Sequence, residues 1–228
     1  IGGVVTLNIT ADAAGYSESA ISVNNKTVTD FTDLGAGAYS VKYTVASGDT
    51  SRLSGAMPAS VVLVDAAGNT NSAYTTVSVN SLAIDCGTPI ITSITSNAGA
   101  AGVLKVGDII LFTLTPQGSE PGATVSGAYN SVALSWSTAN GGATYTAAYT
   151  VTEGDADQPS ALQISGVILT DAASNASAPA SGIDILKTID AHAPVVSIPL
   201  TLTPGAGTLG IGGVVTLNIT ADAAGYSE

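Results

Sequence analysis

Tyr39-Ser-Val-Lys-Tyr-Thr-Val45 carries a bulky or apolar side chain at every second position. Successive side chains of a β-strand point to opposite faces, so the two tyrosines and two valines would face a core while the residues between them face water. The same alternation returns in Tyr145-Thr-Ala-Ala-Tyr-Thr-Val151. We therefore expect two half-buried strands of one design, one in each half of the chain.

The composition favours an all-β protein. Thr, Ser, Ala, Val and Gly dominate the 228 residues, and this mixture supplies β-branched residues for strands and small polar residues for turns. Although 45% of the residues are hydrophobic, no stretch provides the roughly 20 predominantly apolar residues of a membrane-spanning helix, so membrane insertion is not expected. The length suits two domains of about 100 residues, each able to bury a core.

The charge is strongly acidic, with 17 Asp and Glu residues, 5 Lys and Arg residues and a formal net charge of -12. No nucleic-acid partner is expected, because affinity for nucleic acids comes mainly from Lys and Arg that neutralise phosphates. Cys86 is the single cysteine, which excludes an internal disulfide. His192 is the single histidine, and we expect it to lie in an exposed linker. Because no nucleophile motif accompanies it, no enzymatic activity is expected.

Two repeats of different length organise the chain. Residues 1–18, IGGVVTLNITADAAGYSE, recur unchanged as 211–228, which sets a period of 210 residues. A weaker repeat lies inside this period, because Ile84-Asp-Cys-Gly-Thr-Pro89 corresponds to Ile189-Asp-Ala-His-Ala-Pro194, 105 residues later. Either the parent protein carries a long array of such repeats or the chain was deliberately permuted.

We expect the shorter repeat to be an immunoglobulin-like β-sandwich of about seven strands. In one complete copy the alternating runs predict strands near 89–95, 108–115, 122–128, 131–138, 143–152, 161–170 and 177–186. The predicted divisions are 1–88, a domain that lacks its first strand, 89–193, a complete domain, and 194–228, the first two strands of the next copy of the 1–88 domain. An open edge and a matching strand at opposite ends predict head-to-tail strand donation between chains.

Four stretches of the complete copy carry a family resemblance, namely Lys105-Val-Gly-Asp108, Ser119-Glu-Pro121, Tyr149-Thr-Val-Thr-Glu-Gly-Asp-Ala-Asp157 and Thr170-Asp-Ala-Ala-Ser-Asn175. Together they resemble the tandem immunoglobulin-like repeats of giant bacterial cell-surface adhesins, including the extender regions of calcium-dependent RTX-type adhesins. The resemblance implies an extracellular location on the bacterial cell surface and a role in cell adhesion or biofilm as a spacer between neighbouring identical repeats. It also implies calcium ions that stiffen the junctions between domains.

The acidic residues would gather at the two ends of a unit if successive strands alternate in direction. One end of the complete copy would then hold Glu120 and Asp171, and the other end Asp108, Asp155 and Asp157. Carboxylates held close together repel one another, and a hard cation that takes about six to eight oxygen ligands would relieve the repulsion. We therefore expect Ca²⁺ at the junctions, held by Asp49, Asp85, Asp108, Glu120, Asp155, Asp157, Asp171, Asp190 and Glu228.

Two features admit a second interpretation. Asp65-Ala-Ala-Gly-Asn69 and Asp171-Ala-Ala-Ser-Asn175, which lie 106 residues apart, could use their aspartates to shape turns through side-chain to backbone hydrogen bonds. The immunoglobulin-like units could also be binding modules for a glycan or protein ligand, or parts of a surface-layer protein, rather than spacers.

Overall fold

The computed structural model describes residues 1–196 and 199–222, and it is all-β, as the alternating patterns predicted. Its strands pair in antiparallel fashion with one exception, the parallel pair described below. Within the described residues there is no helix of the length and apolarity needed to cross a membrane.

The first unit comprises β1 to β6 and has one core between two three-stranded sheets. One sheet has the order β1 (Val4–Thr10), β5 (Ala38–Thr44), β4 (Phe31–Gly35). The other has the order β3 (Lys26–Thr27), β2 (Ser17–Val23), β6 (Ala59–Val64). The predicted alternation of β5 is confirmed, because Tyr39, Val41 and Tyr43 are 0%, 0% and 3% exposed.

The second unit comprises β7 to β17, and it has a four-stranded sheet, a three-stranded sheet and two further strand pairs. Its largest sheet has the order β12 (Trp136–Ser137), β13 (Tyr145–Thr150), β9 (Ile109–Pro116), β7 (Ile91–Ser96). Opposite stands the sheet β11 (Val132–Ala133), β10 (Thr124–Tyr129), β15 (Ser165–Thr170). Two further pairs are β14 (Leu162–Gln163) with β16 (Asp184–Ile185), and β8 (Gly102–Lys105) with β17 (Lys187–Asp190), the latter parallel.

The core of the second unit is built on aromatic rings. Tyr129 lies with its ring centroid 5.3 Å from that of Phe112 and 5.1 Å from that of Tyr149. Tilted and edge-to-face contacts of this kind are the favoured geometries of aromatic pairs. All three residues belong to one buried cluster, so both sheets are tied to the same core.

A separate hairpin follows the second unit. β18 (Thr201–Thr203) pairs with β19 (Thr216–Asn218), and Leu202 lies opposite Leu217. These leucines are 54% and 49% exposed, and neither strand contributes to the two core clusters of the described chain. The hairpin therefore has a strand pair but no core of its own.

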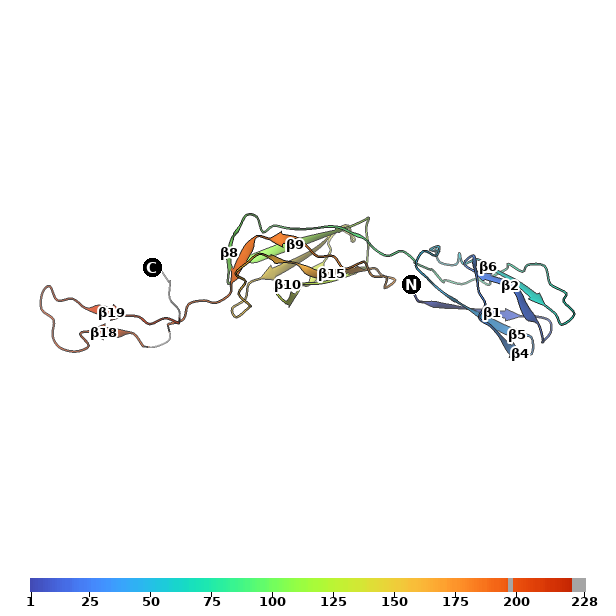
Figure 1. Ribbon diagram of the computed structural model, residues 1–228, viewed down its shortest axis with the longest axis horizontal. Coiled ribbons are helices and arrows are strands. Elements are labelled where there is room, and N and C mark those ends of the chain that lie inside the picture. The colour runs from blue at the N-terminus through green and yellow to red at the C-terminus, as the bar shows by residue number, and fades with distance from the viewer. Residues whose placement is uncertain (197–198, 223–228) are drawn as a thin grey trace.

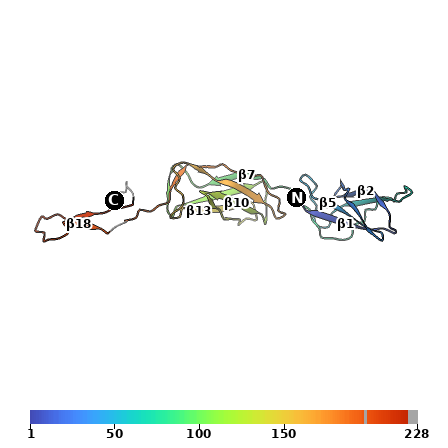
Figure 2. The same ribbon diagram turned by 60° about the horizontal axis from the view of Figure 1, so that its bottom comes forward.

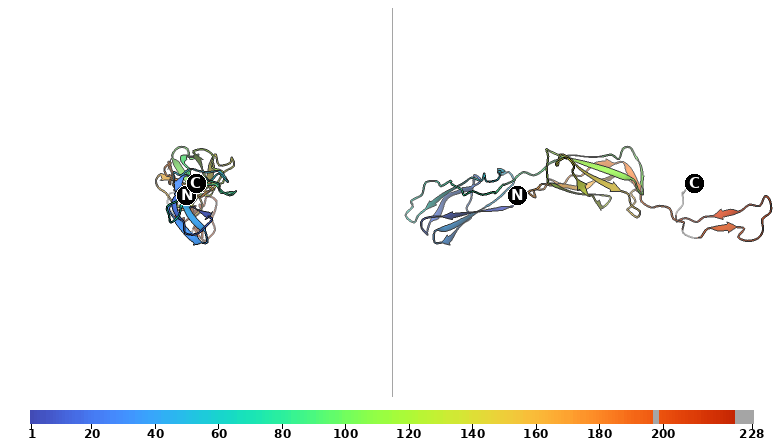
Figure 3. Two further views of the ribbon diagram at one scale, coloured as in Figure 1. Left: turned by 90° about the vertical axis from the view of Figure 1, so that its right-hand side faces the viewer. Right: turned by 180° about the vertical axis from the view of Figure 1, so that it is seen from behind.

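The two units and the hairpin follow one another along the long axis of the molecule (Figure 1). Figure 2, turned about that axis, shows the same order of the three parts. Viewed along the axis, the parts overlap in one narrow outline (Figure 3, left). The chain thus extends mainly in one direction.

The internal repeat is visible in the backbone pairing of the two units. Three isolated bridges of the first unit have counterparts 105 or 106 residues later, namely Val61–Tyr74 with Val167–Ala180, Val64–Thr70 with Thr170–Ala176, and Arg52–Ile84 with Gln158–Ile189. The second unit departs from its predicted strands at 177–186, where only β16 is a strand. Pro179 lacks a backbone N–H and Gly182 has a φ of 99°, and both features interrupt a regular ladder.

Candidate functional site at the junctions between units

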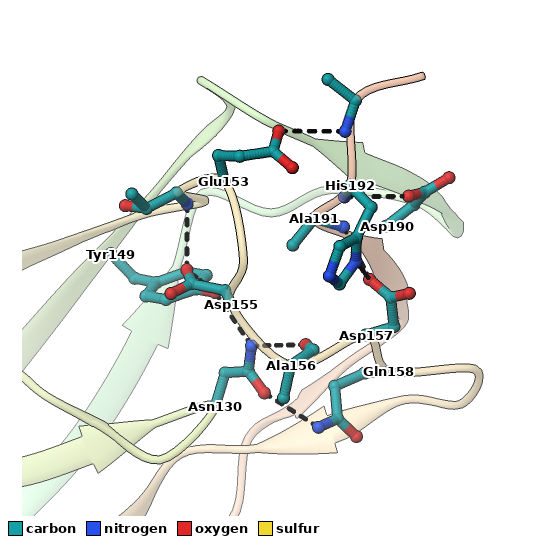
Figure 4. A network of polar contacts seen from close by, with 12 residues as sticks. Asn130, Tyr149, Glu153, Asp155, Ala156, Asp157, Gln158, Asp190, Ala191 and His192 are labelled. Atoms are coloured by element: carbon teal, nitrogen blue, oxygen red, sulfur yellow. Dashed lines mark hydrogen bonds and ion pairs between the residues drawn. The ribbon is translucent and has the colours of Figure 1, made fainter. Parts of the chain in front are cut away.

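A buried asparagine organises the loop after β13 at the end of the second unit (Figure 4). The Asn130 amide donates hydrogen bonds to the Tyr149 hydroxyl at 3.0 Å and to the Ala156 carbonyl at 2.9 Å. Its oxygen accepts a hydrogen bond from Gln158, and Tyr149 donates to Asp155. Asn130 has a φ of 49°, a left-handed conformation that asparagine adopts more readily than most residues.

The first unit contains the same arrangement, 106 residues earlier. Asn24 has a φ of 53°, and its amide donates to the Tyr43 hydroxyl at 3.0 Å and to the Thr50 carbonyl at 2.9 Å. Arg52 donates to the Asn24 oxygen, in the place that Gln158 takes in the second unit. We call this arrangement the asparagine bracket; it holds the loop after β5 in one unit and after β13 in the other.

Each bracket also binds an aspartate of its own loop. Asp49 accepts hydrogen bonds from Tyr43 at 2.6 Å and from the Ala46 N–H at 2.8 Å, and it forms an ion pair with Lys26 at 2.9 Å. These contacts, led by the Tyr43 hydrogen bond, lower the pKa of Asp49 to about 2. Asp155 accepts corresponding hydrogen bonds from Tyr149 and from the backbone of the same loop.

The second junction brings Asp157 to the linker that leaves the second unit (Figure 4). Asp157 accepts a hydrogen bond from the Ala191 N–H at 2.7 Å, and its Oδ1 lies 3.1 Å from Nδ1 of His192. Asp190 accepts a hydrogen bond from the His192 N–H at 3.3 Å. Potential ligand atoms of Asp157, Asp190 and His192 lie within 4.8 Å of one another, and all three residues are exposed.

The electrostatics of this cluster favour a protonated imidazole. The hydrogen bond that the imidazole of His192 donates to Asp157 is the main reason that the pKa of His192 is raised. The pKa of Asp157 is lowered, first by the Ala191 N–H and then by His192. A protonated His192 would therefore supply a positive charge among these acidic groups. Glu153 ties down the same linker by accepting a hydrogen bond from the Ala193 N–H.

Asn175 connects the two units at the first junction. Its amide donates to the Asp171 carboxylate at 2.9 Å and to the backbone carbonyl of Asp85 at 3.3 Å. Asn175 is 2% exposed, whereas its counterpart Asn69 in the first unit is exposed. The contacts across the junction therefore give this asparagine its distinct environment.

Glu120 lies beside this contact, and its carboxyl group has two acidic neighbours. Its pKa is raised, first by burial and then by the negative charges of Asp171 and Asp85. Its backbone is held in place, because the Glu120 N–H donates to the Gly142 carbonyl and its carbonyl accepts from the Tyr145 hydroxyl. Asp85, Glu120 and Asp171 thus offer only oxygen ligands to a cation, and we call them the first-junction acids.

Asp171 also shapes its own turn. Its Oδ1 accepts hydrogen bonds from the Ala173 and Asn175 N–H groups, both at 2.8 Å. Asp65 makes the corresponding contacts with the N–H groups of Ala67 and Asn69 at 2.9 and 2.8 Å. The alternative interpretation of the Asp-x-x-x-Asn stretches thus agrees with the geometry, and a carboxylate with about four acceptor positions retains some capacity for a cation.

The structure separates the nine predicted calcium ligands into groups. Asp171 and Asp85 lie close enough to Glu120 at the first junction to raise its pKa. Asp157 and Asp190 meet at the second. Three others, like Asp85 and Asp171, are bound by N–H groups of their own loops, namely Asp49 by Ala46, Asp108 by Lys105 and Asp155 by Thr152. Glu228 lies outside the described residues.

Sequence reasoning missed the bracket asparagines, the junction asparagine and the contact of His192 with Asp157. The brackets had a detectable signal, because Asn24-Asn25 and Asn130-Ser131 occupy corresponding positions 106 residues apart. Both pairs have positive φ at both residues, as a tight turn between strands requires. His192 is exposed as predicted, but its aspartate partner comes from a loop 35 residues earlier.

Comparison with protein-family models gave no match, and comparison with curated proteins gave no similar sequence.

Proposed function

We propose that the chain is a structural extender segment of a repetitive bacterial cell-surface adhesin or filament, formed by immunoglobulin-like units outside the cell. The asparagine bracket is the observation that carries this proposal, because it recurs with the same two hydrogen-bond lengths in both units. In both units the bracketed loop is also bonded to the last buried stretch before the linker, through Arg52–Ile84 and Gln158–Ile189. Units that are connected in the same way each time can be joined into a long array, which is what a spacer requires.

Calcium stiffens the first junction in this proposal. The first-junction acids provide oxygen ligands only, which is the donor set that calcium prefers. The raised pKa of Glu120 reflects burial together with the two neighbouring negative charges, and a bound cation would offset those charges. Asn175 holds the Asp171 side chain and the Asp85 backbone together, but the three carboxylates must move closer to share one ion, because among the described residues only Asp157, Asp190 and His192 have potential ligand atoms within 4.8 Å of one another.

The second junction fits calcium less well. Its three potential ligands include a histidine nitrogen, which suits transition metals better than calcium. His192, when protonated, provides a positive charge beside Asp157 without a metal. We therefore expect the stronger calcium dependence at the first junction.

Small-angle scattering and thermal unfolding, each with calcium and with a chelator, test this proposal. Calcium should raise the unfolding temperature and narrow the distribution of maximum dimensions, with a stabilisation of about 2.7 kcal/mol when free calcium is roughly 100-fold above Kd. Glu120→Gln should remove most of the response, because it deletes one of the first-junction acids. Asp30→Asn, an equal charge change on an exposed residue before β4, should retain the response.

Identical curves with calcium and chelator would remove calcium from the proposal and leave the extender function standing. Specific capture by one glycan on an array would instead replace the extender function with that of a binding module.

A further inference from the structure

The turn between β12 and β13 contains the only Asn-Gly pair of the sequence, Asn140-Gly141. Gly141 and Gly142 have φ values of 67° and 84°, and the Ala143 N–H donates to the Asn140 carbonyl at 3.5 Å. Positive φ at both central residues is typical of tight hairpin turns, which Asn-Gly sequences favour. The corresponding hairpin of the first unit closes with Asp33-Leu-Gly-Ala-Gly-Ala38, which contains no asparagine. A hairpin at this place therefore does not require one.

An asparagine that is followed by glycine can react with the backbone of its own chain. The nitrogen of the following residue attacks the side-chain carbonyl carbon, and glycine favours this attack because it has no side chain to shield the nitrogen. Asparagine is accordingly counted among the thermolabile residues of proteins. The reaction needs an accessible side chain, a backbone nitrogen that can lose its proton, and a carbonyl oxygen that can accept negative charge.

The Gly141 N–H is the group that would attack, and both Asn140 and Gly141 are exposed. Within the part of the chain that the structure describes, this N–H donates no hydrogen bond to the protein. The N–H groups around it are all bound, and their acceptors are Thr138 Oγ1 for Asn140 and Gly142, the Asn140 carbonyl for Ala143, and Asn140 Oδ1 for Thr144. The Gly141 nitrogen can therefore lose its proton to solvent without breaking a hydrogen bond of the turn.

Two donors hold the side-chain carbonyl of Asn140. Its Oδ1 accepts hydrogen bonds from the Thr138 hydroxyl and from the Thr144 N–H, each at 3.0 Å. Attack by the Gly141 nitrogen would place negative charge on this oxygen, and donors that are already in position stabilise such charge as it develops. The Nδ2 of Asn140, which would leave as ammonia, donates to the Thr144 Oγ1 at 2.9 Å. A hydroxyl group that can exchange protons with solvent thus lies beside the leaving group.

We propose that Asn140-Gly141 is a site of spontaneous modification, at which Asn140 is converted in the folded chain to aspartate and isoaspartate through a cyclic imide. In the first step the bond between the Gly141 nitrogen and the Asn140 Cγ forms, the Cγ–Nδ2 bond breaks, and ammonia leaves with the proton that Gly141 gives up. In the second step water adds to one of the two imide carbonyls. Opening at Cγ gives aspartate, whereas opening at the backbone carbonyl gives isoaspartate. Water is the only co-reactant, and the inference does not depend on the extender function.

The two products should differ in their effect on the contact between this turn and Glu120. Aspartate keeps the backbone of the turn, and its carboxylate can still accept hydrogen bonds from Thr138 and from the Thr144 N–H. Isoaspartate lengthens the main chain by a methylene group next to Gly141. The Gly142 carbonyl accepts the Glu120 N–H at 3.2 Å, so a longer main chain should displace it. Both products also add one negative charge to this acidic end of the second unit.

Peptide mapping by mass spectrometry tests the site. The folded full chain is incubated at mildly alkaline pH, which promotes loss of the Gly141 proton, and samples are digested at intervals. We expect the mass increase of an amide-to-acid conversion to arise first at Asn140, as two products that chromatography separates. Asn80 is the internal control, because Asn80 and Ser81 are both exposed but the attacking residue carries a side chain. Asn140 should react several-fold faster than Asn80.

Two variants separate the contribution of the glycine from that of the surrounding loop. Gly141→Ala adds a methyl group that would meet nothing within 4 Å, and it should slow the conversion several-fold by shielding the nitrogen. Thr138→Val removes the hydroxyl that donates to Oδ1, and it should also slow the conversion because the developing charge loses a donor. Circular dichroism establishes that both variants are folded. Faster reaction at Asn80, or an unchanged rate in Gly141→Ala, would overturn the site. An unchanged or higher rate in Thr138→Val would overturn the role given to the loop.

Thermal unfolding of the separated products tests the structural consequence. The isoaspartate form should unfold at a lower temperature than the unmodified chain, because the contact of Gly142 with Glu120 is disturbed. The variant Asn140→Asp, which carries the same charge on an unchanged backbone, should unfold close to the unmodified chain. Equal unfolding temperatures for all three would overturn the proposed effect on the Glu120 contact.

Discussion

Asn24 and Asn130 illustrate how one side chain can serve two requirements. Each lies at a positive φ, and each satisfies a tyrosine hydroxyl and a backbone carbonyl that would otherwise be without a donor near the core. A buried polar group that loses its partner is costly, which explains why a small network can determine the shape of a whole loop.

Replacement of Asn130 by alanine is therefore expected to destabilise the second unit by about 1–3 kcal/mol, because the Ala156 carbonyl and Tyr149 hydroxyl lose their donor. Ser131→Ala is the matched control, because Ser131 has a φ of 64° and is exposed. Both variants place alanine in a left-handed conformation, so the difference between them isolates the hydrogen bonds. Chemical denaturation measures that difference, and equal losses of stability would show that the bracket contributes nothing.

His192 should titrate above its ordinary pKa of about 6.5, because Asp157 stabilises the protonated imidazole. Because the pKa is raised in the folded chain, the His192–Asp157 pair stabilises the ordered linker fully below about pH 6.5. This stabilisation is lost as the pH rises through the pKa of the folded chain. NMR titration of the imidazole tests this directly. Asp157→Asn should return the pKa towards the ordinary value, Asp30→Asn should leave it raised, and an unchanged pKa in the Asp157 variant would contradict the assignment.

At the scale of the elements, the loop after β12 positions Glu120 through a close backbone approach. A Cβ atom on Gly142 would lie 2.3 Å from the carbonyl oxygen of Glu120, whereas a Cβ atom on Gly141 would meet nothing within 4 Å. Both glycines have positive φ, at 84° and 67°. Gly141 and Gly142 therefore have similar backbone conformations but differ in the room available for a side chain.

Gly142→Ala should consequently cost more stability than Gly141→Ala, by about 1–3 kcal/mol, because the loop must move away from Glu120 in addition to bearing a left-handed alanine. Thermal unfolding of the two variants measures the difference. The Gly142 variant should also lose part of its calcium response, since Glu120 would be displaced. Equal unfolding temperatures would indicate that the loop adapts freely.

The sequence predicted the elements that depend on alternation and failed where pairing depends on distant residues. β5 and β13 were predicted correctly, because one face of each is fully apolar. β8 and β17 were not predicted as a pair, since parallel pairing joins segments 85 residues apart and leaves no local pattern. The same limit applies to the site, where Asn175 owes its role to contacts with another unit.

At the scale of the whole molecule, spacing along the sequence indicated which loops lie at each end of a unit but not how their side chains are used. Asp155 and Asp157 are two residues apart, yet Asp155 is bound by Tyr149 in its own unit and Asp157 by the following linker. A count of acidic residues therefore overestimates the ligands available to a cation at the second junction.

In an extender, each 210-residue period should add length along one axis. Small-angle scattering from this chain and from chains lengthened by one and by two further periods, extrapolated to zero concentration, measures that length directly. We expect equal increments in the maximum dimension for each added period, with an unchanged cross-section. A second increment clearly smaller than the first, or a cross-section that thickens as periods are added, would contradict it.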